Sequence, residues 1–312
     1  MRASLVPSAL RYVDQVARSG SIQRAAKEMN IAASAINRQI LLLERDLGVT
    51  LFDRVARGMR LTSAGDTVVT LARRWRTDER RADADLKRLL GINQGHVRLI
   101  AMDSHANGFL PRVVQVIAEK HPRISLEIQI ASTDEAQAAL LGGEADLVTA
   151  FNLPPHRDLH VIWRRELPLG CVVAPKHVLA KHKTISMQEI VAHPIALQHK
   201  MLAIRRYLDA RHGWLFVEGQ SMVETNSLQL VKLLAASGRY VALTSQLDAA
   251  PEIVAGTLKF IPVRDKGAEP QTISLAIDGR MPLTKIAKIV ADELAESMEE
   301  DLALVAASPR SR

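Results

Sequence analysis

The segment SGSIQRAAKEMN, residues 19–30, separates two stretches of helical periodicity and decides the fold of the N-terminal part of the chain. Gly20 follows an apolar helical face, as a C-cap glycine does. Ser21 is expected to cap the next helix, in which the small Ala25 and Ala26 allow a neighbouring helix to approach closely. We therefore predict two short helices joined by a tight turn.

A third helix is predicted over residues 33–47, because apolar side chains recur there at helical spacing. Its other side carries the short polar and basic side chains of a DNA recognition helix, namely Ser34, Asn37, Arg38 and Gln39. Arginine can bond guanine and glutamine can bond adenine, but both also bond phosphate, so base contact and phosphate contact stay open. A wing follows, and three of its side chains are expected to reach the DNA backbone or a narrow minor groove: Arg54, Arg57 and Arg60. Ser21 completes the predicted DNA contacts.

The charge distribution supports a polyanion as the partner of one region only. Residues 1–90 hold 17 Lys and Arg against 10 Asp and Glu, so their net charge is 17 − 10 = +7. Residues 91–312 hold 24 of each, so their net charge is zero. A small helical bundle with a solvated basic surface is the alternative, but it does not explain this partition.

Composition limits the protein class further. A chain of 312 residues, 47% of them apolar, fits two globular domains and lacks an apolar run long enough for a membrane span. The N-terminus has no signal-peptide core, and the single Cys171 cannot form an internal disulfide. We therefore expect a cytoplasmic protein that does not attach to membranes.

Residues 63–91 are predicted to form one long helix that needs a partner. Its apolar positions follow heptad spacing, and the residues around them are charged. The seam consists of Ala64, Val68, Leu71, Trp75, Ala82, Leu86 and Leu89. A second copy of the chain would cover this seam and give a homodimer, whereas packing against the same chain is the alternative. The glycines of residues 91–95 are expected to end the helix and act as a hinge.

From residue 97 onward, predicted strands and helices alternate, which indicates a largely parallel α/β sheet. The fold class is therefore α/β with an all-α winged helix-turn-helix at the N-terminus.

The order of these motifs resembles that of the LysR-type transcriptional regulators. The matching phrases are SGSI with the following AA at residues 19–26, RQI with LE at residues 38–44, LGV with LFDR at residues 47–54, and LTSAG at residues 61–65. The sequence departs from the family at Ala32 and Ala33, where polar residues are common and where a methyl group can contact only a thymine methyl.

The resemblance implies a winged helix-turn-helix over residues 1–62 and a dimerising linker helix over residues 63–91. It also implies an effector-binding domain over residues 92–305, similar to periplasmic binding proteins, and a tail over residues 306–312. One lobe would comprise about residues 95–163 with 267–303, and the other about residues 164–266. Such regulators bind double-stranded DNA as homodimers or homotetramers, act on RNA polymerase, and respond to a small molecule bound between the lobes.

By this layout, the effector-binding residues follow the strands of both lobes, where ligands bind in α/β sheets. The expected set is Ser104, His105, Asn107, Ser132, Thr133, Asn152, Gln198, Thr225 and Thr244. Helix capping is the alternative role for each of them. A small polar effector is expected, with carboxylates among the classes that the family senses.

Catalysis is not indicated. Asp103, Ser104 and His105 have the residue types of a catalytic triad, but neighbours on one extended segment point in opposite directions. The chain lacks a nucleophile elbow, a phosphate loop and a dinucleotide fingerprint, and His156 with His160 does not fall on a predicted helix. We expect no cofactor, no metal and no enzyme activity. A regulator controlled by protein docking instead of a metabolite remains the alternative function.

Overall fold

The computed structural model describes residues 5–55, 58–89, 95–200, 202–213 and 222–308. The chain divides into two compact units. The first comprises residues 1–94 with 142–144, and the second comprises residues 95–141 with 145–312. The predicted hinge at residues 91–95 lies almost entirely outside the described residues.

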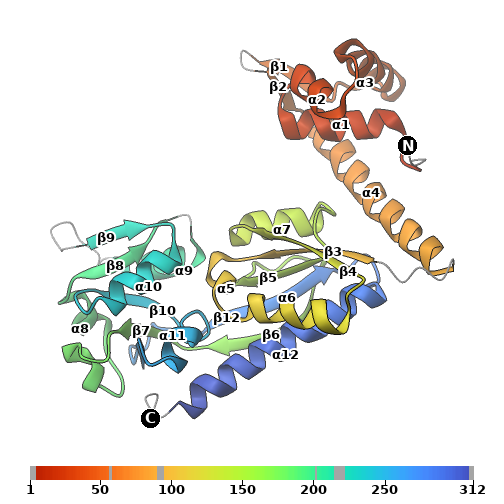
Figure 1. Ribbon diagram of the computed structural model, residues 1–312. Helices are drawn as coiled ribbons and strands as arrows, with labels where there is room; N and C mark the ends of the chain where they lie inside the picture. The colour runs from red at the N-terminus through yellow and green to blue at the C-terminus, as the bar shows by residue number, and fades with distance from the viewer. Residues whose placement is uncertain (1–4, 56–57, 90–94, 201, 214–221, 309–312) are drawn as a thin grey trace. The chain divides into compact units, whose positions relative to one another are not determined.

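The first unit is a winged helix-turn-helix followed by a long helix (Figure 1). Its elements are α1 (Ser8–Ser19), α2 (Ile22–Met29), α3 (Ala33–Leu47), β1 (Phe52–Val55), β2 (Gly58–Leu61) and α4 (Ser63–Leu89). Strands β1 and β2 pair antiparallel and form the wing. The side chains of Val13, Ala25, Ile36 and Leu51 lie in one core, so the apolar faces of α1, α2 and α3 meet as their periodicity predicts.

Several helix ends in this unit are capped. Gly20 adopts a left-handed conformation at the end of α1, as predicted. The Thr62 hydroxyl accepts a hydrogen bond from the backbone N–H of Gly65 at 3.0 Å and so caps α4. Ser21 occupies the N-cap position of α2, as predicted, but its side chain makes no cap hydrogen bond, and its hydroxyl donates to the Gln23 side chain at 3.1 Å. A Cβ on Gly65 would lie 2.0 Å from the carbonyl oxygen of Leu51, so this position needs glycine.

The second unit contains two five-stranded sheets, each the centre of one lobe (Figure 1). The first sheet has the order β4 (Ile124–Ile130), β3 (Gly95–Ala101), β5 (Leu147–Phe151), β12 (Gln271–Asp278) and β6 (Leu159–Leu167). The second has the order β11 (Lys259–Pro262), β7 (Leu169–Val173), β10 (Val241–Ser245), β8 (Ile195–Gln198) and β9 (Met222–Thr225). We call them lobe I and lobe II.

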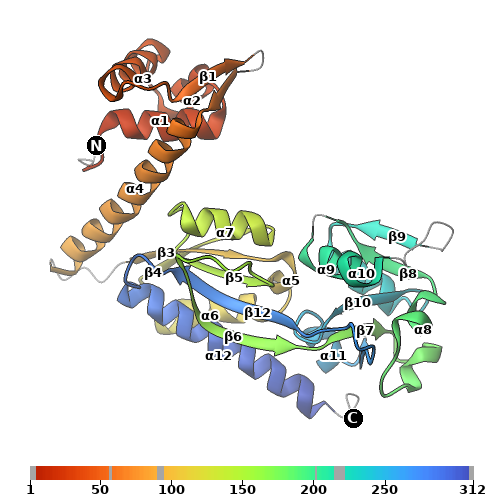
Figure 2. The same cartoon turned by 180° about the vertical axis from the view of Figure 1, so that it is seen from behind.

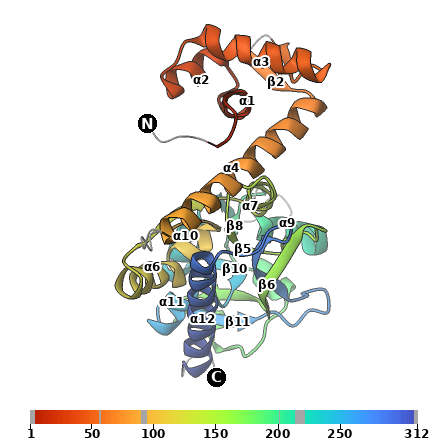
Figure 3. The ribbon, with the colours of Figure 1, turned by 90° about the vertical axis from the view of Figure 1, so that its right-hand side faces the viewer.

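Helices cover both sheets. In lobe I, α7 (Thr133–Leu141) covers one face, while α6 (Phe109–Lys120) and α12 (Lys285–Ala307) lie side by side on the other (Figures 1 and 3). A single helical turn, α5 (Asp103–Ala106), follows β3. Lobe II carries η1 (Val178–Lys181), α8 (Met187–Val191), α9 (Ala203–His212), α10 (Leu228–Ala236) and α11 (Ala250–Val254).

The sheets are mixed, not largely parallel. Strands β3, β4 and β5 pair in parallel, as do β8, β9 and β10, but β12 pairs antiparallel with both β5 and β6. The reason is topological. The chain leaves lobe I through β6 into β7 and returns through β12, so the two crossing strands run in opposite directions (Figure 2).

Candidate DNA-binding surface and lobe junction

The solvent-facing side of α3 brings three of the predicted DNA contacts together. Ser34 and Arg38 are exposed and Asn37 is half-buried, and the positions i, i+3 and i+4 place them on one face. These side chains make no hydrogen bond or ion pair with the residues that the structure describes. Gln39 lies about 100° further round the helix from Arg38, beside the buried Ile40, so it does not share this face.

The wing carries the other predicted arginine contacts. Arg54 is exposed, and Arg60 is exposed with a loose ion pair to Asp53 at 3.7 Å. Arg57 lies outside the described residues. The backbone N–H of Met59 donates to the carbonyl of Gly20 at 2.9 Å, which attaches the wing to the turn between α1 and α2.

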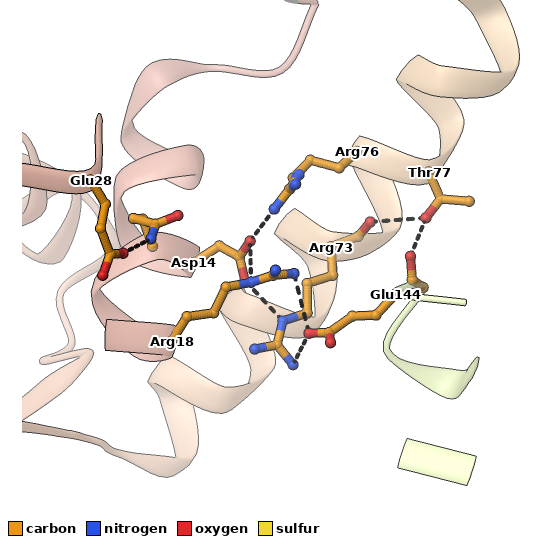
Figure 4. A network of polar contacts seen from close by, with 9 residues as sticks. Asp14, Arg18, Glu28, Arg73, Arg76, Thr77 and Glu144 are labelled. Carbon is orange, nitrogen blue, oxygen red and sulfur yellow. Dashed lines mark hydrogen bonds and ion pairs between the residues drawn. The ribbon is translucent and has the colours of Figure 1, made fainter. Parts of the chain in front are cut away.

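A buried aspartate joins α1 to α4 (Figure 4). Asp14 is only 1% exposed, and its carboxylate accepts hydrogen bonds from Arg73 at 2.8 Å, Arg76 at 2.5 Å and Arg18 at 3.3 Å. Burial alone would raise the pKa of Asp14, but the hydrogen bond from Arg73 and the charges of the three arginines outweigh burial and hold this pKa below its usual value. The helix-turn-helix is therefore anchored to α4 by a fully compensated buried charge.

The predicted effector-binding residues lie at the carboxyl ends of strands, and several of them act as local braces. The Ser132 hydroxyl accepts from the backbone N–H of Glu135 at the start of α7, while the Ser132 hydroxyl and backbone N–H both donate to the Glu135 carboxylate. The Thr225 hydroxyl accepts from the backbone N–H of Ser227, and the Thr133 hydroxyl donates to the Phe151 carbonyl at 3.1 Å. Three of the nine predicted effector-binding residues therefore cap or brace the local backbone.

Four others have buried polar atoms without a hydrogen-bond partner among the described residues. These atoms are Ser104 Oγ, both ring nitrogens of His105, Asn152 Nδ2 and Gln198 Oε1. The other end of the Gln198 amide donates to the Leu243 carbonyl at 2.7 Å, and Asn152 Oδ1 accepts from the backbone N–H of Thr272. Each of these two amides is therefore held in place while one of its polar atoms stays unused, an arrangement that is costly unless a ligand or water completes it.

The turn α5 and the residue after it are hydrogen-bonded to lobe II through two side chains. Asp103 accepts a hydrogen bond from the backbone N–H of Leu228, at the start of α10, at 3.0 Å. The Asn107 amide, just after α5, donates to Gln229 at 3.0 Å and to Glu252 at 3.3 Å. We predicted an extended segment at residues 103–105. This was wrong, because they form a helical turn, from which Asp103 reaches lobe II while His105 packs against lobe I aromatic rings.

Ser104 on the same turn lies against Asp248 of lobe II. Asp248 is buried, and it accepts a hydrogen bond from Thr244 at 3.1 Å while its second carboxylate oxygen has no partner among the described residues. Burial raises the pKa of Asp248, and the nearby hydroxyls of Ser104, Ser245 and Thr244 offset this only in part. The Ser104 hydroxyl of lobe I therefore lies near the Asp248 carboxyl of lobe II.

His105 is buried between aromatic rings. Its ring centroid lies 4.9 Å from that of Phe109 and 5.9 Å from that of Phe151. Burial lowers the pKa of His105 to about 3, so the ring is neutral at pH 7. Its aromatic surroundings make it part of the lobe I core.

We did not predict several residues at the junction between lobes I and II from the sequence. Lys232 is almost fully buried in the apolar helix α10 and pairs with Glu252 at 2.8 Å and with the Asp248 carbonyl at 3.0 Å. Arg206 of lobe II pairs with Asp134 of lobe I at 2.5 Å. A lone lysine within the run Leu228–Ala236 was a usable signal, because a lysine on an apolar face needs a buried partner.

Membrane-spanning potential and the single cysteine complete the description. No described helix has the length and apolar character needed to cross a membrane. Cys171 is buried in β7, and burial raises the pKa of its thiol.

Comparison with known proteins places both units in one family. Residues 7–66 match the bacterial regulatory helix-turn-helix of the LysR family, and residues 91–299 match the LysR substrate-binding domain. The RuBisCO operon transcriptional regulator of Allochromatium vinosum is 26% identical over 76% of this chain and 78% of its own length. The transcriptional activator CmpR of Synechocystis is 24% identical over 80% and 81%.

Solved structures share the fold. A full-length OxyR variant from Pseudomonas aeruginosa superposes with a TM-score of 0.64 at 19% identity, covering 96% of this chain and 95% of that one. Full-length CbnR, in complex with its target DNA, superposes with a TM-score of 0.56 at 18% identity, covering 94% and 98%. The two domain matches together span the helix-turn-helix and both lobes, and the chain belongs to the LysR family of transcriptional regulators.

Proposed function

We propose that this LysR-type regulator binds double-stranded DNA through the exposed face of α3 and through the wing, and that a small polar molecule bound between lobes I and II controls it. The DNA part is supported by the exposed Ser34 and Arg38 on one helix face and by the positive charge of residues 1–90. Major-groove contact by α3 with phosphate contact by Arg54, Arg57 and Arg60 would give a sequence-specific regulator.

We further propose that the protein acts as a homodimer or a tetramer built from dimers. Three side chains of the predicted α4 seam, Leu71, Trp75 and Leu86, are exposed in the single chain. A second α4 would bury them, and a two-fold axis there would match the dyad of an operator. Contact with RNA polymerase follows from this role as a proposal only.

The ligand part rests on one observation: buried polar atoms without partners among the described residues occur at or just after the carboxyl ends of strands in both lobes. Ser104 and Asn152 follow strands of lobe I, while Gln198 and Asp248 lie at or after the ends of strands of lobe II. Hydroxyl and amide N–H groups can donate there, and amide and carboxyl oxygens can accept. A small ligand with both donors and acceptors, such as a hydroxy or amino acid, would satisfy them, and carboxylates are the first class to test.

Such a ligand would act by changing the contact between the lobes. Asp103 and Asn107 already connect α5 to lobe II, so a ligand beside Ser104 would strengthen or displace these contacts. Either result shifts the balance between two lobe arrangements, and the shift can proceed only as far as the ligand's differential affinity for them allows.

A thermal-shift screen of the full-length protein tests the ligand proposal. The library contains small organic acids, aromatic acids and amino acids, and a hit raises the unfolding midpoint in a dose-dependent manner. Ser104→Ala should remove the effect, whereas the matched control Ser125→Ala, on an exposed residue of β4, should keep it. A complete absence of hits, with DNA binding intact, would contradict metabolite control and favour control by protein docking.

A further inference from the structure

Leu41 continues the DNA-facing side of α3. Ser34, Asn37, Arg38 and Leu41 stand at positions i, i+3, i+4 and i+7, so one stripe of the helix carries all four. Leu41 is 51% exposed, although the apolar side chains on the opposite side of α3, Ile36, Ile40 and Leu43, are buried or half-buried. The core of the helix-turn-helix therefore does not use this leucine.

An exposed leucine carries little meaning by itself, because much of any protein surface is apolar. The position of Leu41 distinguishes it. It lies one turn beyond Asn37 and Arg38 on the face proposed to enter the groove, within residues 1–90, which carry the whole positive excess of the chain. DNA offers one apolar group in the major groove, the 5-methyl of thymine.

We propose that Leu41 determines specificity by contacting a thymine methyl in the major groove, next to the base pair that Arg38 contacts. This inference rests on the proposed DNA-binding function and deepens it. Three residues advance about 4.5 Å along a helix, whereas successive base pairs are about 3.4 Å apart. The thymine should therefore lie one or two base pairs from the Arg38 contact in each half-site.

The test begins with the sites that the full-length protein itself selects from random-sequence DNA duplexes. In the enriched duplex, each thymine is replaced in turn by deoxyuridine, which removes only the 5-methyl group. We expect one position in each half-site where this replacement weakens binding roughly fourfold, the effect of losing one buried methyl.

The protein variant then identifies the contact. Leu41→Ala should weaken binding to the thymine duplex by a similar factor and should abolish the effect of deoxyuridine at that position. The matched control is Leu230→Ala, an exposed leucine of α10, which should keep full sensitivity to the methyl group. Thermal unfolding of Leu41→Ala should match that of the wild type, because the core lacks this side chain.

Several outcomes overturn the inference. Sequence-specific binding without sensitivity to any thymine methyl would do so, as would a Leu41→Ala variant that keeps this sensitivity. Unchanged DNA binding together with lost transcriptional activity would assign Leu41 to a protein partner instead. If no sequence is enriched at all, the proposed DNA-binding function fails as well, so the two failures are distinguishable.

Discussion

Asp14 in the DNA-binding unit and Asp248 at the lobe junction are both buried carboxyl groups, at 1% and 6% exposure, but their surroundings differ. Three arginines surround Asp14, and they hold its pKa below the usual value. Hydroxyl groups and a more distant lysine surround Asp248, and burial raises its pKa. A charge compensated by opposite charges fixes two helices together, whereas a carboxyl with an unused oxygen would suit the lobe rearrangement that we propose.

The largest effect is expected when the negative charge of Asp14 is removed from among its three arginines. Asp14→Asn leaves three arginines facing a neutral group, and loss of one partner from a buried pair costs about 3–5 kcal/mol. The arginines are partly exposed, so we expect roughly 2–3 kcal/mol, measured by urea denaturation at pH 7.

The pH dependence of stability tests the direction of the Asp14 pKa shift. Because the pKa of Asp14 is lowered in the folded state, its stabilisation is present above the unfolded value near 3.8 and is lost as the pH falls through the folded pKa. Asp14→Asn should remove that acid-side loss. The matched control Asp53→Asn, on an exposed wing residue, should leave both stability and its pH dependence nearly unchanged.

The second effect concerns His105, beside Ser104. The pKa of His105 is about 3 in the folded protein, whereas it is near 6.5 in the unfolded chain. Stability is therefore complete above pH 6.5 and is lost as the pH falls toward 3, by up to about 1.4 kcal/mol per pH unit. His105→Phe should flatten this slope, with the exposed His160→Gln as its control. An unchanged slope in His105→Phe would show that the ring is protonated or accessible in the fold.

The third prediction concerns Asp248→Asn, which should not lower stability as Asp14→Asn does. Asp248→Asn removes a poorly compensated charge and adds an N–H that can donate to Ser104, so stability at neutral pH should stay equal or rise by about 1 kcal/mol. The raised pKa means that the carboxyl contributes stability below pH 3.8 and loses it as the pH rises through the folded pKa. Asp248→Ala, which leaves Thr244 without its acceptor, should instead destabilise. Equal losses for both variants would show that Asp248 is charged and compensated, like Asp14.

The smallest effect sharpens the comparison at the lobe junction. Asn107→Ala removes two exposed hydrogen bonds between the lobes and should cost only about 0.5–1 kcal/mol of global stability. Its main consequence should be faster hydrogen exchange at the start of α10, measured by mass spectrometry. Asn226→Ala, a neighbouring exposed asparagine, serves as the control and should not change this exchange. Identical protection in both variants would remove Asn107 from the lobe contact.

Features of the helices that depend on neighbouring residues could be predicted from the sequence. The periodicity around Ile36 and Ile40 and the glycine after α1 appear as expected, because each depends on residues within one or two turns. Ser21 stands at the N-cap position of α2 as predicted, but whether its hydroxyl bonds the backbone or a nearby side chain such as Gln23 depends on side-chain geometry that the sequence does not resolve.

Long-range pairs were beyond prediction. Asn107 finds Gln229 across 122 residues, and Asp14 finds Arg76 across 62. A single sequence indicates each residue's preference for a partner but not the identity of that partner. The four-residue turn α5 was also missed, because one helical turn leaves no periodic pattern.

The placement of β12 has a consequence for synthesis on the ribosome. All five strands of lobe II lie between Leu169 and Pro262, whereas the lobe I sheet needs β12, at Gln271–Asp278, between β5 and β6. Lobe II can therefore complete its sheet while lobe I still lacks a central strand. The N-terminal helix-turn-helix is translated first and lobe I is finished last, so the nascent chain holds a folded DNA-binding unit before its regulatory domain is complete.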